Sequence, residues 1–151
     1  MVVLRPGEMP ARVTQQRLLR AIALAEPMLS VESRKRAYLA ALERWPASAT
    51  ARFGYAHALH TAGQLSAAEA SYREIVSRHP RHAAALNNLA GVLTDRGCHT
   101  QAIAVASRAL VIATEDQPGL VGPITETLRN LPASAGDEGR CRQVDEASRI
   151  H

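Results

Sequence analysis

Apolar residues recur at helical spacing along most of the chain, and Gly and Pro interrupt this pattern at regular places. In the stretch 51–62, for example, Phe53 and Ala56 lie three positions apart, as on one face of a helix. Gly63 then supplies the backbone freedom that ends a helix. A second helical pattern runs from there to Pro80, whose missing N–H prevents continuation. The pattern therefore predicts a helical hairpin.

The second helix of this hairpin has a predicted start signal. Ser66 and Glu69 have the spacing of a capping box, in which the hydroxyl and the carboxylate each satisfy a free backbone N–H. We therefore expect Ser66 to cap this helix.

The same pattern of turn and small residues returns after 34 residues. Gly63 is repeated as Gly97, and Ala68 is repeated as Ala102. Such a period is typical of stacked repeats, because one hairpin cannot bury its apolar face alone and shares a core with its neighbours. The sequence predicts three units, at residues 15–48, 49–82 and 83–116.

The spacing within the units resembles the tetratricopeptide repeat, whose pattern is W-x2-L-G-x2-Y, then A-x3-F, then Pro. The first unit departs from it, because Arg34 replaces the small Ala and Pro27 should end the first helix early. The second unit carries Tyr55, Ala56, Leu59, Ala68, Tyr72 and Pro80 at these places, and the third carries Leu86, Leu89, Ala90, Leu93, Ala102 and Ala106, with Thr114 where proline is expected.

This resemblance implies an all-α fold, an α-solenoid of about three helical hairpins stacked in a right-handed superhelix. A further helix at about 123–131 should cap the exposed edge of the third unit with Ile124, Leu128 and Leu131. The tetratricopeptide domain is thus expected at 15–131, after an extended linker at 1–14 and before a polar, disordered tail at 132–151.

A second resemblance extends to the start of the chain. The run from "VVLRPGEMPA" through the repeats is similar to the repeat tail that follows the papain-like domain of certain bacterial C39-type cysteine peptidases. It implies an accessory region, with the catalytic cysteine and histidine upstream of this chain. Whether the reading frame continues upstream of Met1 would decide between this alternative and a self-contained scaffold.

Composition and charge favour a helical fold and argue against a nucleic-acid-binding arm. The chain is 46% hydrophobic but only 3% aromatic, which favours closely packed helices. Its net charge of +4 is spread too thinly for a nucleic-acid arm. The densest basic cluster, "RHPRH" at 78–82, is interpreted as a solvated loop rather than a nucleic-acid patch. Nucleic-acid binding stays a third hypothesis, and steep salt dependence would be its signature.

No motif for catalysis or for a cofactor is found. Cys98 and Cys141 lie far apart, so we expect no disulfide framework, and Cys98 next to His99 has no activating partner. His57 and His60 are interpreted as surface residues, because a metal site needs further ligands. The chain is therefore predicted to be neither an enzyme nor a metalloprotein, and to need no cofactor.

The first residues carry no apolar run of signal-peptide length, and "IAVASRALVIA" is too short to span a bilayer. We expect a soluble protein without membrane insertion, cytoplasmic as given, or periplasmic if a longer exported chain exists.

The resemblance to tetratricopeptide repeats places a binding groove along the first helix of each unit. Phe53, the one phenylalanine, should be covered by a ligand there, and the Asn87 and Asn88 amides could bind a peptide backbone. For any single groove residue the alternative is a merely solvated side chain. The predicted peptide-binding residues are Leu19, Phe53, His57, His60, Asn87, Asn88, Gly91 and Thr94, with Gln16, Ala23 and Thr50 beside them.

The partner's chemistry follows from what these positions lack. Chaperone-binding members of the family hold a terminal carboxylate with Lys, Arg and Asn, but only Asn88 of the matching residues here fits that clamp. Without a cation, a buried carboxylate would lose its water uncompensated. We therefore expect a neutral to apolar protein or peptide segment as the partner. The matching clamp positions are Leu19, Ala23, Gly54, Ala84 and Asn88.

Overall fold

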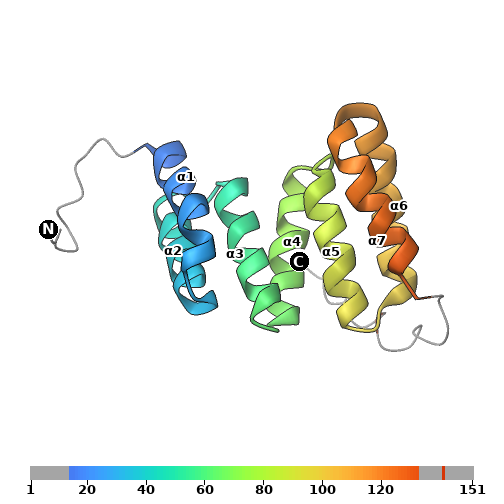
Figure 1. Ribbon diagram of the computed structural model, residues 1–151, viewed down its shortest axis with the longest axis horizontal. Helices are drawn as coiled ribbons and strands as arrows, with labels where there is room; N and C mark the ends of the chain where they lie inside the picture. The colour runs from blue at the N-terminus through green and yellow to red at the C-terminus, as the bar shows by residue number, and fades with distance from the viewer. Residues whose placement is uncertain (1–13, 133–140, 142–151) are drawn as a thin grey trace, which may run out of the picture.

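The computed structural model describes residues 14–132 and Cys141, and it is all-α over these residues. The helices stand side by side in one row, in chain order from α1 and α2 at one end to α6 and α7 at the other (Figure 1). This is the α-solenoid that the sequence predicts. The helices are α1 (Gln15–Ala25), α2 (Val31–Arg44), α3 (Ala49–Thr61), α4 (Leu65–Arg78), α5 (Ala83–Asp95), α6 (His99–Asp116) and α7 (Val121–Asn130), with short 3-10 turns at Glu26–Met28 and Pro118–Leu120.

Two glycines make the turns inside the second and third hairpins. Gly63 and Gly97 have φ of 73° and 79°, a backbone conformation that residues with a side chain rarely adopt. In both turns the next residue donates its N–H five residues back, from Gln64 to the carbonyl of Leu59 at 2.9 Å and from Cys98 to that of Leu93 at 2.8 Å. The repeated glycine therefore ends α3 and α5 with the same type of turn.

The first hairpin turns in a different way, as its sequence predicts. α1 ends at Ala25, and Pro27 follows inside the 3-10 turn Glu26–Met28. Ser30 then caps α2, its hydroxyl accepting the N–H of Ser33 at 3.1 Å. The hairpin thus closes without a glycine.

The predicted capping box at the start of α4 is wrong. The helix begins at Leu65, with Gln64 in the capping place, so Ser66 already lies inside the first turn. Glu69 is buried and forms ion pairs with Arg73, at 2.7 Å, and with Arg96. The turn at Gly63 sets where α4 starts, and Glu69 faces the third hairpin instead of its own N-terminus.

Small residues allow the helices to approach closely. Ala56, Ala68, Ala90 and Ala102 are all fully buried and belong to one core cluster. Tyr72, also fully buried, belongs to the same cluster. The core therefore continues from the second hairpin into the third, which is why neither needs to be stable alone.

The end of the repeat array is closed by α7. Because Thr114 replaces the expected proline, α6 runs on to Asp116 and has 18 residues, against 14 in α4. α7 then packs back on α6, and its Ile124 is 1% exposed. Ile124 shares a cluster with Ala83, Leu86, Ala109, Ile112 and Ala113.

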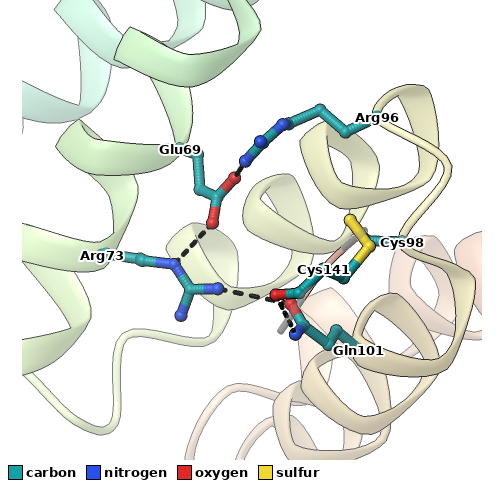
Figure 2. The surroundings of a disulfide bond; sticks show 6 residues. All are labelled: Glu69, Arg73, Arg96, Cys98, Gln101 and Cys141. Atoms are coloured by element: carbon teal, nitrogen blue, oxygen red, sulfur yellow. Dashed lines mark hydrogen bonds and ion pairs between the residues drawn. A yellow bond between two sulfur atoms is a disulfide. The ribbon is translucent and has the colours of Figure 1, made fainter. Parts of the chain in front are cut away.

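A disulfide joins Cys98, at the start of α6, to Cys141, with the Cα atoms 5.8 Å apart. The expectation of no disulfide is wrong, and Cys141 is buried instead of belonging to a loose tail. The carbonyl of Cys141 also accepts a hydrogen bond from Gln101 at 3.2 Å, beside the Glu69 ion pairs (Figure 2). The pairing was missed because 43 residues separate the two cysteines.

The predicted linker and tail fall almost wholly outside the described residues. Of 1–14 only Thr14 is described, where its hydroxyl accepts the N–H of Arg17. Of 132–151 only Pro132 and Cys141 are described. The linker prediction and, apart from Cys141, the tail prediction therefore stay predictions.

Replacing Ile124 tests the capping role of α7. Ile124→Ala should lower the free energy of unfolding by about 2–5 kcal/mol, because it leaves a cavity between α7 and the third hairpin. Arg129→Ala, on the exposed side of the same helix, is the control and should have little effect. Urea denaturation measures both, and equal stabilities would contradict the role.

Removing the disulfide should destabilise the fold by about 2–4 kcal/mol, because the bond restricts the unfolded chain. Thermal melts with and without a reducing agent measure this effect. The double variant Cys98→Ala/Cys141→Ala should melt like the reduced parent and should not respond to reductant. A parent that melts identically in both conditions would contradict a stabilising bond.

Candidate functional site

Two neighbouring cavities run along the first helices of the hairpins. The larger, of about 640 Å³, lies against α1 and α3. The smaller, of about 330 Å³, continues toward α5. They share Tyr38 and Thr50, and we call the pair the groove. The larger is lined by Thr14, Gln15, Gln16, Leu19, Arg20, Ala23, Tyr38 and Thr50, and the smaller by Glu26, Tyr38, Thr50, Phe53, Gly54, His57 and Asn88.

Most of the predicted groove residues meet there. Gln16, Leu19, Ala23, Thr50, Phe53, His57 and Asn88 line one cavity or the other. Leu19 is only 7% exposed and also belongs to the core of the first hairpin. His57 is exposed, as expected of a surface histidine.

Four predicted residues line neither cavity. His60 pairs with Asp95 at 2.7 Å, and its ring also lies 3.6 Å from where a Cβ of Gly91 would stand. Thr94 donates its hydroxyl to the carbonyl of Ala90 at 2.8 Å. Asn87 has a buried Oδ1 without a hydrogen-bond partner in the described part of the chain. Their binding role stays a prediction.

Phe53 is partly covered by the protein itself. Its ring meets Tyr72 edge to face, with 5.7 Å between the ring centroids, and stacks on His82 at 5.6 Å. The prediction that a ligand alone would cover Phe53 was too simple, although part of the side chain still lines the smaller cavity.

Tyr38 forms the wall between the two cavities, and it depends on Gly54. A Cβ at position 54 would lie 2.3 Å from the Tyr38 ring, so any larger residue would displace it. The hydroxyl of Tyr38 donates to the carboxylate of Glu26. Burial, with the neighbouring carboxylate, raises the pKa of Tyr38 well above its usual range, so Tyr38 acts as a donor at neutral pH.

Sequence reasoning missed Glu26 and Tyr38 as groove residues. Glu26 occupies the same position in its unit as His60 and Thr94, which were predicted, so the period alone could have found it. Tyr38 lies on the second helix of its hairpin, and the resemblance places the groove on the first helices only.

The amide of Asn88 is held in place by Tyr72. Its Nδ2 donates to the Tyr72 hydroxyl at 3.1 Å. Burial raises the pKa of Tyr72 to about 12, and this hydrogen bond lowers the pKa by a smaller amount. Asn88 therefore presents a fixed orientation to the smaller cavity.

His82 caps α5 and also packs against Phe53, a residue of the smaller cavity. Its Nδ1 accepts the N–H of Ala85 at 3.1 Å while its ring stacks on Phe53. Burial lowers the pKa of His82, and the nearby His79 acts in the same direction. The neutral ring is therefore the form that the fold requires.

The basic turn at 78–82 is largely neutralised. Arg81 pairs with Glu115 and Asp116 at 2.7 and 2.6 Å, and Arg78 pairs with Glu74 at 3.1 Å. These side chains are solvated and paired, in agreement with the interpretation as a loop.

Other chemistry has little support among the described residues. Cys98 is tied to Cys141, so no thiolate is present beside His99. Residues 14–132 and Cys141 contain no group of three or more His, Cys, Asp or Glu that could hold a metal ion. None of the described helices is long and apolar enough to cross a membrane.

Comparison with known families agrees with the geometry. The tetratricopeptide repeat family matches residues 35–76 and 56–118, which together cover more than half of the chain. The chain therefore belongs to the tetratricopeptide repeat family, whose members are typically protein-interaction scaffolds. No curated protein matches the chain.

The cap at His82 should make stability depend on pH. As the pH falls below about 6.5, the ordinary histidine pKa, the unfolded chain binds a proton before the folded chain does. The stability is thus fully present above that pH and is lost as the pH falls through the lowered folded-state pKa of His82. Urea denaturation at pH 7.5 and 5.5 should show this loss.

His82→Asn keeps a capping acceptor but cannot titrate, so it should remove part of the pH dependence. His57→Asn, at an exposed position, is the matched control and should behave like the parent. An unchanged pH dependence in His82→Asn would show that the cap does not couple stability to pH.

Proposed function

We propose that the protein is a non-catalytic scaffold that binds a segment of a partner protein in the groove. The observation that carries this proposal is the pair of neighbouring cavities along α1 and α3, which open to solvent at exposed residues such as Ala23 and His57. A cleft that joins an apolar floor to a few polar groups is typical of a binding site.

The lining favours a neutral, partly apolar segment. The buried Leu19 and Tyr38 give the larger cavity an apolar floor, on which an aliphatic side chain of the partner can pack. Asn88 and Thr50 offer hydrogen bonds to a peptide backbone. The binding energy would thus come from apolar burial, with the amide and the hydroxyl fixing the direction of the segment.

An acidic segment fits less well. Arg20 lines the larger cavity, but its side chain is exposed, and exposed ion pairs contribute only about 0–1 kcal/mol. The smaller cavity contains the carboxylate of Glu26, which would repel a second one. We therefore expect no useful affinity for peptides with acidic C-termini.

The accessory region of a C39-type peptidase stays an alternative. It would use the same groove to recruit a substrate, while an upstream domain cuts. The strand-like run on which this resemblance partly depends falls within residues 1–13, outside the described residues.

Blocking the larger cavity should abolish binding. Ala23→Trp fills the cavity from an exposed helical position, so it should cost little stability but at least tenfold in affinity. Ala21→Trp makes the same change on the same helix at an exposed residue outside the groove. The measurement is fluorescence anisotropy with labelled peptides selected by the parent protein from a displayed random dodecapeptide library.

An acidic C-terminal peptide serves as the second probe. Tight, salt-sensitive binding of this peptide, or equal loss of affinity in Ala21→Trp and Ala23→Trp, would contradict the proposed groove.

A further inference from the structure

The smaller cavity combines aromatic rings with a carboxylate. Three rings, of Tyr38, Phe53 and His57, line it together with the Glu26 carboxylate. Aromatic faces attract cations through their negative quadrupole, and a carboxylate accepts charge-assisted hydrogen bonds. This set of groups suits a positively charged side chain better than an apolar one.

Glu26 has no ion-pair partner among the described residues. It is half-buried and accepts the Tyr38 hydroxyl, but no Lys, Arg or His of residues 14–132 forms an ion pair with it. Arg34 is near enough to affect the Tyr38 hydroxyl, yet it makes no ion pair with Glu26. A partly desolvated carboxylate that forms no ion pair is costly, and a cation from outside that pairs with it would offset that cost.

The equivalent positions in the other units show the contrast. His60 stands 34 residues after Glu26 and is paired with Asp95, while Thr94, a further 34 residues on, donates to its own helix. Both are satisfied within the protein. Glu26 is the member of this series that still offers a charge to a ligand.

We propose that the smaller cavity binds an arginine or lysine side chain of the partner segment, with Glu26 as its counter-ion and Tyr38 and Phe53 as its aromatic walls. The proposal rests on the proposed function and narrows it, since the segment would be apolar in the larger cavity but would carry one cation for the smaller. Because the two cavities share Tyr38 and Thr50, one segment would place an aliphatic side chain in the larger cavity and the cation in the smaller. Arginine is favoured, because its planar group stacks on rings and pairs with a carboxylate through two N–H groups.

The test is a selection from the displayed dodecapeptide library with three proteins. These are the parent, Glu26→Gln and Glu32→Gln. The amide introduced by Glu26→Gln keeps an oxygen that can accept the Tyr38 hydroxyl, so only the charge is lost. Glu32, an exposed residue paired with Lys35 and outside both cavities, gives the same change in net charge. Thermal melts should show all three folded.

We expect the parent and Glu32→Gln to enrich peptides with Arg or Lys at one fixed position, and Glu26→Gln to lose this preference. In a parent-selected peptide, replacing that Arg by the neutral isostere citrulline should weaken binding about tenfold or more for the parent. The same replacement should change the affinity of Glu26→Gln much less. Calorimetric titration measures both.

Three outcomes would overturn the proposal. Enriched peptides without a cation, whose binding Ala23→Trp still blocks, would overturn the cation site and leave the groove intact. A cation preference that persists in Glu26→Gln would also overturn it. No enrichment by any of the three proteins would overturn the groove itself together with this inference.

Discussion

Close contact between helices at small residues is the constraint on which the rest of the structure depends. The fully buried Ala56 and Ala68 let α3 and α4 pack closely, and Ala90 and Ala102 do the same for α5 and α6. Gly54 extends this rule to the first hairpin, because only a residue without Cβ leaves room for the Tyr38 ring. Since Tyr38 in turn divides the groove into its two cavities, the shape of the site follows from helix packing.

The parts of the fold that the sequence predicts are those with local causes. Gly63 and Gly97 end helices through their own backbone conformation, and Pro27 ends α1 through its missing N–H. The helix before Pro80 ends at Arg78 for the same reason. The 34-residue period then predicts the groove, because equally spaced helix ends bring the same face of each first helix to the same side. Leu19, Phe53, His57 and Asn88 line the groove, as this period predicts.

What the sequence could not predict depends on contacts between distant residues. Glu69 has the spacing of a capping residue, but the ion pair with Arg96, from the next hairpin, is a tertiary contact that no local pattern contains. The bond between Cys98 and Cys141 is missed for the same reason. Tyr38 is a further case, since its role in the groove follows from the glycine opposite it and not from its own helix.

The most irregular unit therefore carries the most distinctive chemistry of the site. In the regular hairpins the residues equivalent to Glu26 are satisfied internally, His60 by Asp95 and Thr94 by the carbonyl of Ala90. In the first hairpin, Pro27 ends α1 immediately after Glu26, and a 3-10 turn replaces the glycine turn. Glu26 thus accepts the hydroxyl of Tyr38 from α2 but forms no ion pair within the part of the chain that the structure describes. Departure from the repeat at this point replaces the glycine turn by a 3-10 turn, and it places beside the smaller cavity a carboxylate that forms no ion pair among the described residues.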